Sequence, residues 1–282
     1  MKTALVLEGG GMRGAYTCGT IDFLLDNNIH FDGVIGVSAG ACHATSYISE
    51  QRGRAIRIGA HYLVDKRSFS FKSLIQTGDL FNAQFIYDEI PNVIDPFDYK
   101  TFNNSKTRMY CVCFDCENGQ SIYAPIPHIQ ENMEYIRASA SLPIISKIVE
   151  FDGHKMLDGG LGDSIPFEFM MDKGYDKIVV VSTKVRGYRK SSNKLMPMIE
   201  KMYKDYPYVI DACKNRHTRY NAQFEKMEEL EKEGKLFVIY PSDTHGVGRL
   251  EQDVVKLESL YKTGYQDAQD CKDALCEYLQ IA

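Results

Sequence analysis

The chain has 282 residues, of which 44% are hydrophobic, enough for one large buried core. Lysine and arginine together number 33 and aspartate and glutamate 38, so the formal net charge is −5. This balance argues against a general nucleic-acid binder, which needs a basic surface field. It is compatible with a local basic patch facing an anionic lipid surface.

The N-terminal residues predict a buried strand rather than a targeting segment. Residues 3–7 (TALVL) form a short continuous apolar run, as in a strand buried on both faces, and Glu8 ends it. A secretory core needs roughly 7–15 apolar residues and a membrane-spanning helix roughly 20. Neither occurs in the chain, so we expect a cytoplasmic protein whose membrane contact is at most peripheral.

Two strand–turn–helix units are predicted next. Residues 9–11 are glycines that end the first strand, and apolar residues then recur at helical spacing over 15–25. Residues 34–37 predict a second strand, and a turn at Ser38 leads into a helix over 39–49. This alternation implies parallel strands joined by right-handed crossovers.

The middle of the chain is less regular. Helices are expected at 82–90, 131–141 and 166–173, and strands at 106–114, 121–124, 155–157 and 177–183. After about residue 190 the chain is rich in Lys, Glu, Met and Tyr. It predicts helices over 195–233 and 251–279 with one strand at 235–240. We therefore expect an α/β domain over residues 1–190 and a mainly helical extension over 191–282 packed on it.

Eight cysteines are present, and without a secretory signal they are expected to be free thiols. Cys111, Cys113 and Cys116 are clustered, but a zinc site would need a fourth ligand, and His128 is poorly placed. Cys111 and Cys113 lie two residues apart in a predicted strand and share a face. This spacing favours packing in the core over metal binding.

The sharpest motif is Gly36-Val37-Ser38-Ala39-Gly40, a G-x-S-x-G between a predicted strand and a predicted helix. In this context the serine occupies a strained elbow, and the flanking glycines remove side chains that would collide there. The N-terminus of the following helix favours negative charge at a reacting carbonyl. The alternative is a glycine-rich turn in which Ser38 only caps the helix.

A second glycine-rich loop, Gly9-Gly10-Gly11-Met12-Arg13-Gly14, also lies between a strand and a helix. Consecutive glycines leave backbone N–H groups free to converge on an oxyanion or a phosphate. Gly9, Gly11 and Gly14 also fit the dinucleotide fingerprint, which requires an acidic residue about 20 positions later, at the end of the second strand. Ser38 follows that strand instead of an acid.

Asp158-Gly159-Gly160 follows the predicted strand at 155–157. Alone, it is more typical of a simple turn. It gains significance as a candidate site because it is the third polar position flanked by glycines in this chain, after the two loops above.

The histidines decide which type of hydrolase the motifs describe. An ordinary triad needs a histidine to take the serine proton, and in an α/β-hydrolase that histidine follows the acid. This order leaves His217 and His245. His217 lies in a charged helix with a solvated face, so His245, in a loop with glycines, is the triad candidate. His43 follows Ser38 on the next helix, a poor position from which to reach the hydroxyl.

Together the three motifs resemble the patatin-like phospholipase family, which has a glycine-rich loop after its first strand, a G-x-S-x-G elbow and a later D-G-G or D-G-A. They occur here in that order at 9–14, 36–40 and 158–160. Residues 138–143 (ASASLP) resemble the family's small-residue stretch ending in proline. The resemblance covers about residues 3–185. With the predicted elements, it implies a three-layer α/β/α sandwich with a mainly parallel sheet.

The resemblance implies roles for individual residues. Ser38 is the nucleophile and Asp158 the base of a Ser-Asp dyad without histidine. A carboxylate within hydrogen-bond reach of the serine can accept its proton directly. The oxyanion hole would be formed by the backbone amides of Gly10, Gly11 and Met12. The remaining motif residues support these groups: Gly9, Arg13, Gly14, Gly36, Gly40, Gly159 and Gly160.

Two positions depart from the family's pattern. Glu8 precedes the first loop where the family commonly has Asp, and we expect it to affect the anchoring of the loop more than the chemistry. Ser164, in Asp163-Ser164-Ile165-Pro166, stands where the family often has Asn, and it is expected to weaken a supporting hydrogen bond. Arg13 matches the family's basic residue after the glycines. It can bind anionic head groups or form a surface salt bridge.

Residues after 190 resemble the helical extension of a bacterial subgroup of this family. Its aromatic and methionine side chains either pack as core or form a lid or membrane-facing surface together with Lys201 and Lys204. The side chains in question are Tyr203, Tyr206, Tyr208, Met196, Met198 and Met202.

We therefore expect a serine hydrolase that cleaves carboxylic esters of phospholipids, lysophospholipids or related lipids. No cofactor and no metal are expected, because the dyad needs none. The expected partners are the lipid or ester substrate and, peripherally, a membrane, but no nucleic acid. Two alternatives stay open: a nucleotide- or phosphate-binding enzyme that uses residues 9–14, and a catalytically silent lipid-binding module.

Overall fold

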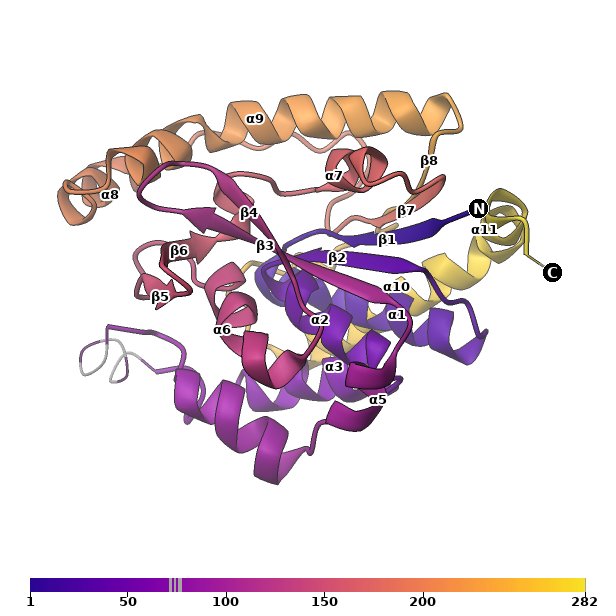
Figure 1. Cartoon of the computed structure of the whole chain (residues 1–282), viewed down its shortest axis with the longest axis horizontal. Helices are drawn as coiled ribbons and strands as arrows, with labels where there is room; N and C mark the ends of the chain where they lie inside the picture. The colour runs from indigo at the N-terminus through magenta and orange to yellow at the C-terminus, as the bar shows by residue number, and fades with distance from the viewer. Residues whose placement is uncertain (71–72, 74, 76–77, 282) are drawn as a thin grey trace.

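One mixed sheet runs through the middle of the molecule, in a computed structural model that describes residues 1–281 except 71, 72, 74, 76 and 77. The strand order is β5-β6-β3-β2-β1-β7-β8, with β4 also paired to β3 (Figure 1). The strands are β1 (Thr3–Leu7), β2 (Gly33–Val37), β3 (Arg108–Asp115), β4 (Ser121–Pro125), β5 (Val149–Phe151), β6 (His154–Asp158), β7 (Lys177–Val181) and β8 (Leu236–Ile239).

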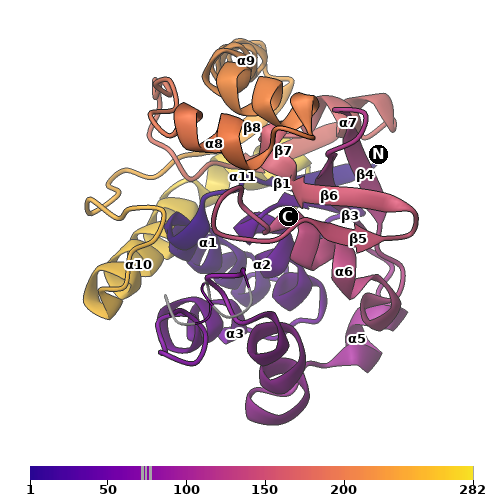
Figure 2. The same ribbon diagram turned by 90° about the vertical axis from the view of Figure 1, so that its left-hand side faces the viewer.

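Helices cover both faces of the sheet, which gives the predicted three layers (Figure 2). The α-helices are α1 (Ala15–Asp26), α2 (Ala39–Ile48), α3 (Arg54–Ile56), α5 (Tyr99–Asn104), α6 (Ile129–Ser139), α7 (Phe167–Asp172), α8 (Met196–Met202), α9 (Pro207–Lys232), α10 (Val254–Asp270) and α11 (Lys272–Leu279). The 3₁₀-helices are η1 (Gly11–Gly14) and η4 (Gly159–Leu161), and the π-helices are η2 (Arg57–Tyr62) and η3 (Phe85–Ile94).

The mainly parallel sheet is confirmed, with antiparallel pairings at one end. The pairs along β3-β2-β1-β7-β8 are parallel, whereas the pairs β3–β4, β3–β6 and β5–β6 are antiparallel. The short strand β5 was not predicted. It forms a hairpin with β6 across Asp152-Gly153, whose φ angles are 52° and 78°. An Asp-Gly pair at positive φ is typical of a tight hairpin turn.

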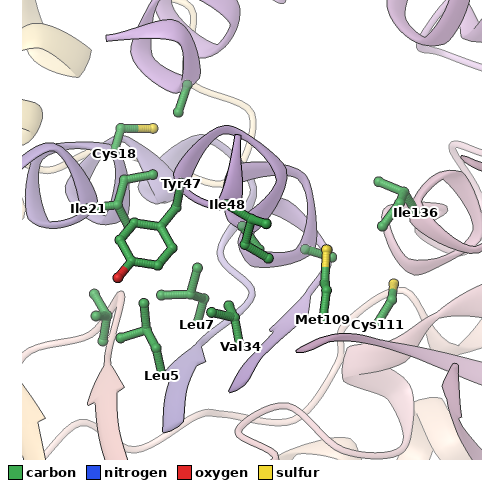
Figure 3. Close-up of a cluster of buried hydrophobic side chains, with 14 of the residues drawn as sticks. Leu5, Leu7, Cys18, Ile21, Val34, Tyr47, Ile48, Met109, Cys111 and Ile136 are labelled. Carbon is green, nitrogen blue, oxygen red and sulfur yellow. The ribbon is translucent and has the colours of Figure 1, made fainter. Parts of the chain in front are cut away.

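Successive residues of β1 pack into different cores, because side chains alternate between the two faces of a strand. Leu5 and Leu7 join the cluster formed with α1, α2 and α10, part of which Figure 3 shows. Ala4 and Val6 join the opposite cluster, formed with α7 and α9. A strand covered on both faces has no solvated side, which explains why its sequence is apolar without alternation. The predicted core packing of Cys111 and Cys113 is confirmed, since both are fully buried.

The segment after residue 190 is joined to the sheet and to the helices. β8 adds a strand beside β7, and α10 packs against α1 on the opposite face from α9 (Figure 1). The approach of α10 to α1 is close. A Cβ on Gly264 would lie 2.0 Å from the carbonyl oxygen of Tyr16. The predicted division at residue 190 therefore falls within a shared core and stays a prediction.

Some of the aromatic and methionine side chains of the C-terminal helices pack in the core, and others are exposed at the surface. Tyr203 is buried, and Met196 and Tyr206 pack against the same small core cluster. Met198, Met202 and Tyr208 instead leave about half of their surface exposed, at 49%, 53% and 49%. None of the helices in the described part of the chain has the length and apolar character needed to cross a bilayer.

Candidate active site

Ser38 occupies a strained elbow between β2 and α2. Its φ and ψ are 56° and −125°, a conformation that non-glycine residues rarely adopt, and its side chain makes no capping hydrogen bond to α2. The elbow fits tightly against β1, because a Cβ on Gly40 would lie 2.3 Å from the carbonyl oxygen of Leu7. A Cβ on Gly36 would lie 2.5 Å from the backbone nitrogen of Ala41. The two glycines of the motif are therefore required by close backbone contacts.

The register of β3 brings Ser38 and Asp158 together. β4 pairs with β3 from Tyr110 to Phe114 and so occupies one of its edges. β2 and β6 must share the other edge, since each residue of a strand has only two neighbours in the sheet. On that edge Val37 lies opposite Val112 and Asp158 lies opposite Cys113. The two strands therefore end facing each other, although their last residues, Val37 and Asp158, are 121 positions apart in the chain.

The small-residue stretch predicted at 138–143 links the two strand ends. The hydroxyl of Ser139 accepts a hydrogen bond from the Ser38 N–H at 2.8 Å and donates one to the Val112 carbonyl at 2.6 Å. The Asp158 N–H donates to the Ser141 carbonyl at 2.8 Å. A larger side chain at residue 139 would occupy the space between β2 and β3, which accounts for the small residue there.

The Asp158 side chain is buried, and only one of its oxygens is engaged. Oδ1 accepts a hydrogen bond from the Gly160 N–H at 2.8 Å. Oδ2 is buried without a hydrogen-bond partner among the described residues. The Ser164 hydroxyl donates to the Gly160 carbonyl at 3.0 Å, so Ser164 also supports this loop. The Arg216 Nε donates to the same carbonyl at 2.7 Å.

No direct hydrogen bond joins the Ser38 hydroxyl and the Asp158 carboxylate in the described structure. Both side chains line the same small polar pocket, together with Gly10 and Gly11. Contacts of this kind are often loose in ligand-free enzymes and tighten when substrate binds.

The described glycine-rich loop leaves two amides of this pocket's lining free, rather than the three expected. The N–H groups of Gly10 and Gly11 have no hydrogen-bond partner among the described residues. The Met12 N–H donates to the Arg249 carbonyl at 3.0 Å, so it is already engaged, contrary to the role expected for it. The Met12 side chain instead lines a neighbouring apolar pocket.

Glu8 anchors this loop, as its position after β1 predicted. Its carboxylate accepts hydrogen bonds from the Thr183 N–H at 2.7 Å, the Ser182 hydroxyl at 2.8 Å and the Tyr220 hydroxyl at 2.6 Å. Glu8 is 1% exposed. One side chain therefore ties the end of β1 to the end of β7 and to α9. The contribution of Tyr220 could not be foreseen, because nothing in its local sequence distinguishes it.

The remaining motif residues have packing or surface roles. Gly9 and Gly160 line the small pocket beside Ser38, and a Cβ on Gly159 would lie 2.1 Å from the Val112 carbonyl oxygen. Gly14 packs on the ring of His43. The Arg13 Nε donates to the Val247 carbonyl at 3.1 Å, and the described residues offer it no salt bridge.

The histidines do not supply an ordinary triad. The His245 Nε2 lies 2.7 Å from the Thr263 hydroxyl on α10, and His245 lines neither of the pockets that Ser38 lines. His245, the candidate for the alternative triad, therefore lies outside the pockets at Ser38. His43 is buried against the loop, and burial lowers its pKa to about 4, which keeps its imidazole neutral.

Ser38 lies where two pockets of different character meet. The first is apolar and is formed by α2, η2, η3 and α6, with side chains such as Ile58, Leu63, Phe81, Ile86, Met133 and Ile136. The second is small and polar and contains Asp158 and the glycine loop. Gly11, Ser38, Leu142 and Arg249 line both pockets. A molecule reacting at Ser38 can therefore place an apolar part on one side and a polar part on the other.

Comparison with protein families agrees with this fold and site. A family model described as patatin-like phospholipase matches residues 5–171. The match covers more than half of the chain, so the chain belongs to the patatin-like phospholipase family, and the predicted family and fold are confirmed. This membership supports the prediction of a lipid acyl hydrolase. A second model, for a domain of unknown function (DUF6363), matches residues 206–280.

The share of a relative's own length that this chain covers differs greatly from one relative to another. An uncharacterized protein of Escherichia coli, YjjU, is 26% identical over 93% of this chain and 75% of its own length. Lysophospholipase nte1 of Aspergillus terreus is 25% identical over 94% of this chain but only 18% of its own length. Among solved structures, VipD from Legionella pneumophila superposes with a TM-score of 0.54 at 12% identity, covering 97% of this chain and 67% of VipD.

Proposed function

We propose that this protein hydrolyses carboxylic esters of lysophospholipids or related single-chain lipids through a Ser38–Asp158 dyad. The observation that carries the proposal is the meeting of the β2 and β6 ends on one edge of β3. It sets a strained serine beside a buried carboxylate whose Oδ2 has no partner among the described residues. The named lysophospholipases among the relatives support a lipid ester as substrate.

The proposed reaction has two halves. Asp158 accepts the Ser38 proton as the oxygen attacks the ester carbonyl, and the N–H groups of Gly10 and Gly11 stabilise the oxyanion. The tetrahedral intermediate then expels the alcohol, which takes the proton from Asp158, and an acyl-serine remains. Asp158 next accepts a proton from water as the water attacks the acyl-serine. The fatty acid leaves and the proton returns to Ser38.

The apolar pocket is the proposed site of the acyl chain. Its lining is mainly aliphatic and aromatic, and it begins at Ser38 and Met12. Burial of each methylene of a chain contributes about 0.8 kcal/mol, so long chains should bind and react better than short ones. We propose that this pocket takes a single chain, which favours lysophospholipids over lipids with two chains.

A glycine of this pocket offers a test of chain length. Gly59 lines the pocket, and a Cβ placed on it would meet no other atom within 4 Å. We expect Gly59→Phe to shift the preferred ester from long to short acyl chains, because the ring would occupy space that the chain needs. The measurement is kcat/KM on a series of esters that differ only in chain length, with Ser38→Ala as the background. An unchanged chain-length profile in a folded variant would exclude this pocket as the acyl site.

Two further expectations from the sequence remain proposals. The division at residue 190 separates a segment that carries Ser38 and Asp158 from one that adds α8 to α11 and β8. Peripheral contact with a membrane is proposed through exposed apolar side chains of the second segment, such as Met198 and Met202, which lie near Lys201 in sequence.

A further inference from the structure

Five cationic side chains line the small polar pocket beside Ser38. They come from separate parts of the chain: Arg13 from η1, Lys184 and Lys190 from the segment after β7, Arg216 from α9, and Arg249 from the loop before α10. The carboxylates that line the pocket are Glu8 and Asp158. Basic side chains therefore outnumber carboxylates by three in this pocket. Only Arg13 was singled out from the sequence.

The two carboxylates offset these cations only in part. Both oxygens of Glu8 accept hydrogen bonds from Ser182, Thr183 and Tyr220, and Asp158 Oδ1 makes one long ion pair, 4.0 Å from Arg216 Nη2. Within the described residues, no carboxylate oxygen comes within 4.0 Å of Arg13, Lys184, Lys190 or Arg249. These four groups face neutral partners or none.

The partners of the two lysines are weak ones for an ammonium group. Lys184 is 7% exposed, and its Nζ donates to the carbonyl and the hydroxyl of Thr183 at 3.3 and 3.2 Å. The Nζ of half-buried Lys190 lies 3.7 Å from the centre of the Tyr220 ring. Burial and the neighbouring cations together lower the pKa of Lys184 to about 8 and that of Lys190 to about 6, although the Glu8 carboxylate acts in the opposite direction.

An anion in this pocket would relieve the repulsion among these groups. The position of the pocket beside Ser38 indicates which kind of anion would bind there. The pocket shares Ser38 with the apolar pocket, and Arg249 lines both, with its side chain against Gly11. An ester that reacts at Ser38 with its chain in the apolar pocket directs its alcohol portion into the cationic pocket.

We infer that the cationic pocket binds the phosphate of a single-chain lipid whose phosphate lies within a few bonds of the scissile ester, as in a lysophospholipid. The inference rests on the proposed ester hydrolysis at Ser38 and names the substrate class of that site. It also gives the C-terminal segment a function, because Arg216 and Arg249 lie in the part matched by the model of unknown function. That segment would supply head-group recognition to a nucleophile carried by the N-terminal segment.

Two substrates that differ only in the phosphate test this inference. A 1-acylglycerol 3-phosphate and the 1-monoacylglycerol of the same chain length present the same ester, and we expect kcat/KM to be at least tenfold higher for the phosphate-bearing lipid. The double variant Lys190→Met/Arg249→Met should reduce that ratio about tenfold or more, mainly through KM, while preserving side-chain length. Neither side chain makes a hydrogen bond to another described residue, so folding should be preserved, and circular dichroism checks it.

A matched control and a second probe separate the outcomes. Lys214, exposed on α9 and absent from both pockets, gives the control Lys214→Met, which should leave the ratio unchanged. Inorganic phosphate should inhibit monoacylglycerol hydrolysis competitively in the wild type and about tenfold less strongly in the double variant. A lysophospholipid with a choline phosphodiester, assayed in parallel, shows whether the pocket takes a phosphodiester as well as a monoester.

Failure of this inference is distinct from failure of the proposed function. Equal kcat/KM for the two lipids in the wild type, or a ratio that the double variant leaves unchanged, overturns the cationic pocket as a phosphate site. Ester hydrolysis itself would still stand. Absence of hydrolysis of either lipid, with the same trace activity in Ser38→Ala, overturns the proposed function instead.

Discussion

Asp158→Asn should lower kcat for ester hydrolysis by about 10²- to 10⁴-fold, the range expected when a general base is removed. The asparagine keeps the size of the side chain, and its amide oxygen can still accept the hydrogen bond that the Gly160 N–H now donates to Oδ1. What it cannot do is accept a proton from the Ser38 hydroxyl. The effect is therefore expected in kcat, measured at saturating substrate, with little change in thermal stability.

The control for this variant is His245→Ala. His245 contacts Thr263 and lines neither pocket at Ser38, so its removal should leave kcat within about twofold of the wild type. A large loss of kcat in folded His245→Ala, together with a small loss in Asp158→Asn, would replace the dyad with an ordinary triad.

Glu8→Ala is expected to lower the free energy of unfolding by about 3–5 kcal/mol. Its removal leaves the Thr183 N–H and the Tyr220 hydroxyl without an acceptor, whereas the Ser182 hydroxyl still has the Lys184 carbonyl at 3.1 Å. A buried donor without a partner costs about 1–3 kcal/mol. The three donors belong to two segments that Glu8 joins to the end of β1. Chemical denaturation measures the loss.

Two further variants calibrate this result. Glu8→Gln keeps the shape but offers one acceptor oxygen instead of two, and a loss of about 1–3 kcal/mol is expected. Glu229→Ala, at an exposed position of α9, should stay within about 0.5 kcal/mol of the wild type. If Glu8→Ala proves no more destabilising than Glu229→Ala, the anchoring role of Glu8 is wrong.

Local sequence patterns predicted the parts of this site that depend on local geometry. The elbow at Ser38 and the loop at Gly9–Gly14 follow from glycines placed between a strand and a helix, because the backbone there has few other solutions. The continuous apolar run of β1 predicted burial on both faces, because a strand with one solvated face would alternate apolar and polar residues. The Asp152-Gly153 hairpin carried a usable signal that was overlooked.

The parts that depend on long-range pairing were not predictable from the sequence. The sharing of one β3 edge by β2 and β6 depends on strand register, which no local pattern encodes. Residues such as Lys190, Arg216 and Arg249 are ordinary surface cations in the sequence, and only the fold gathers them in one pocket. The engagement of the Met12 N–H by the Arg249 carbonyl is equally non-local, which is why a third oxyanion amide was wrongly expected.

The central claim is that Ser38 is the nucleophile, and labelling with a fluorophosphonate tests it most directly. The reagent phosphonylates an activated serine and releases fluoride, so intact-protein mass spectrometry should show one adduct on the wild type and none on Ser38→Ala. Slow labelling of Asp158→Asn would connect the activation to the carboxylate. An adduct on folded Ser38→Ala equal to that of the wild type would contradict the claim, because another residue would then be the activated nucleophile. No adduct on folded wild-type protein would also contradict it and would favour a catalytically silent lipid-binding fold.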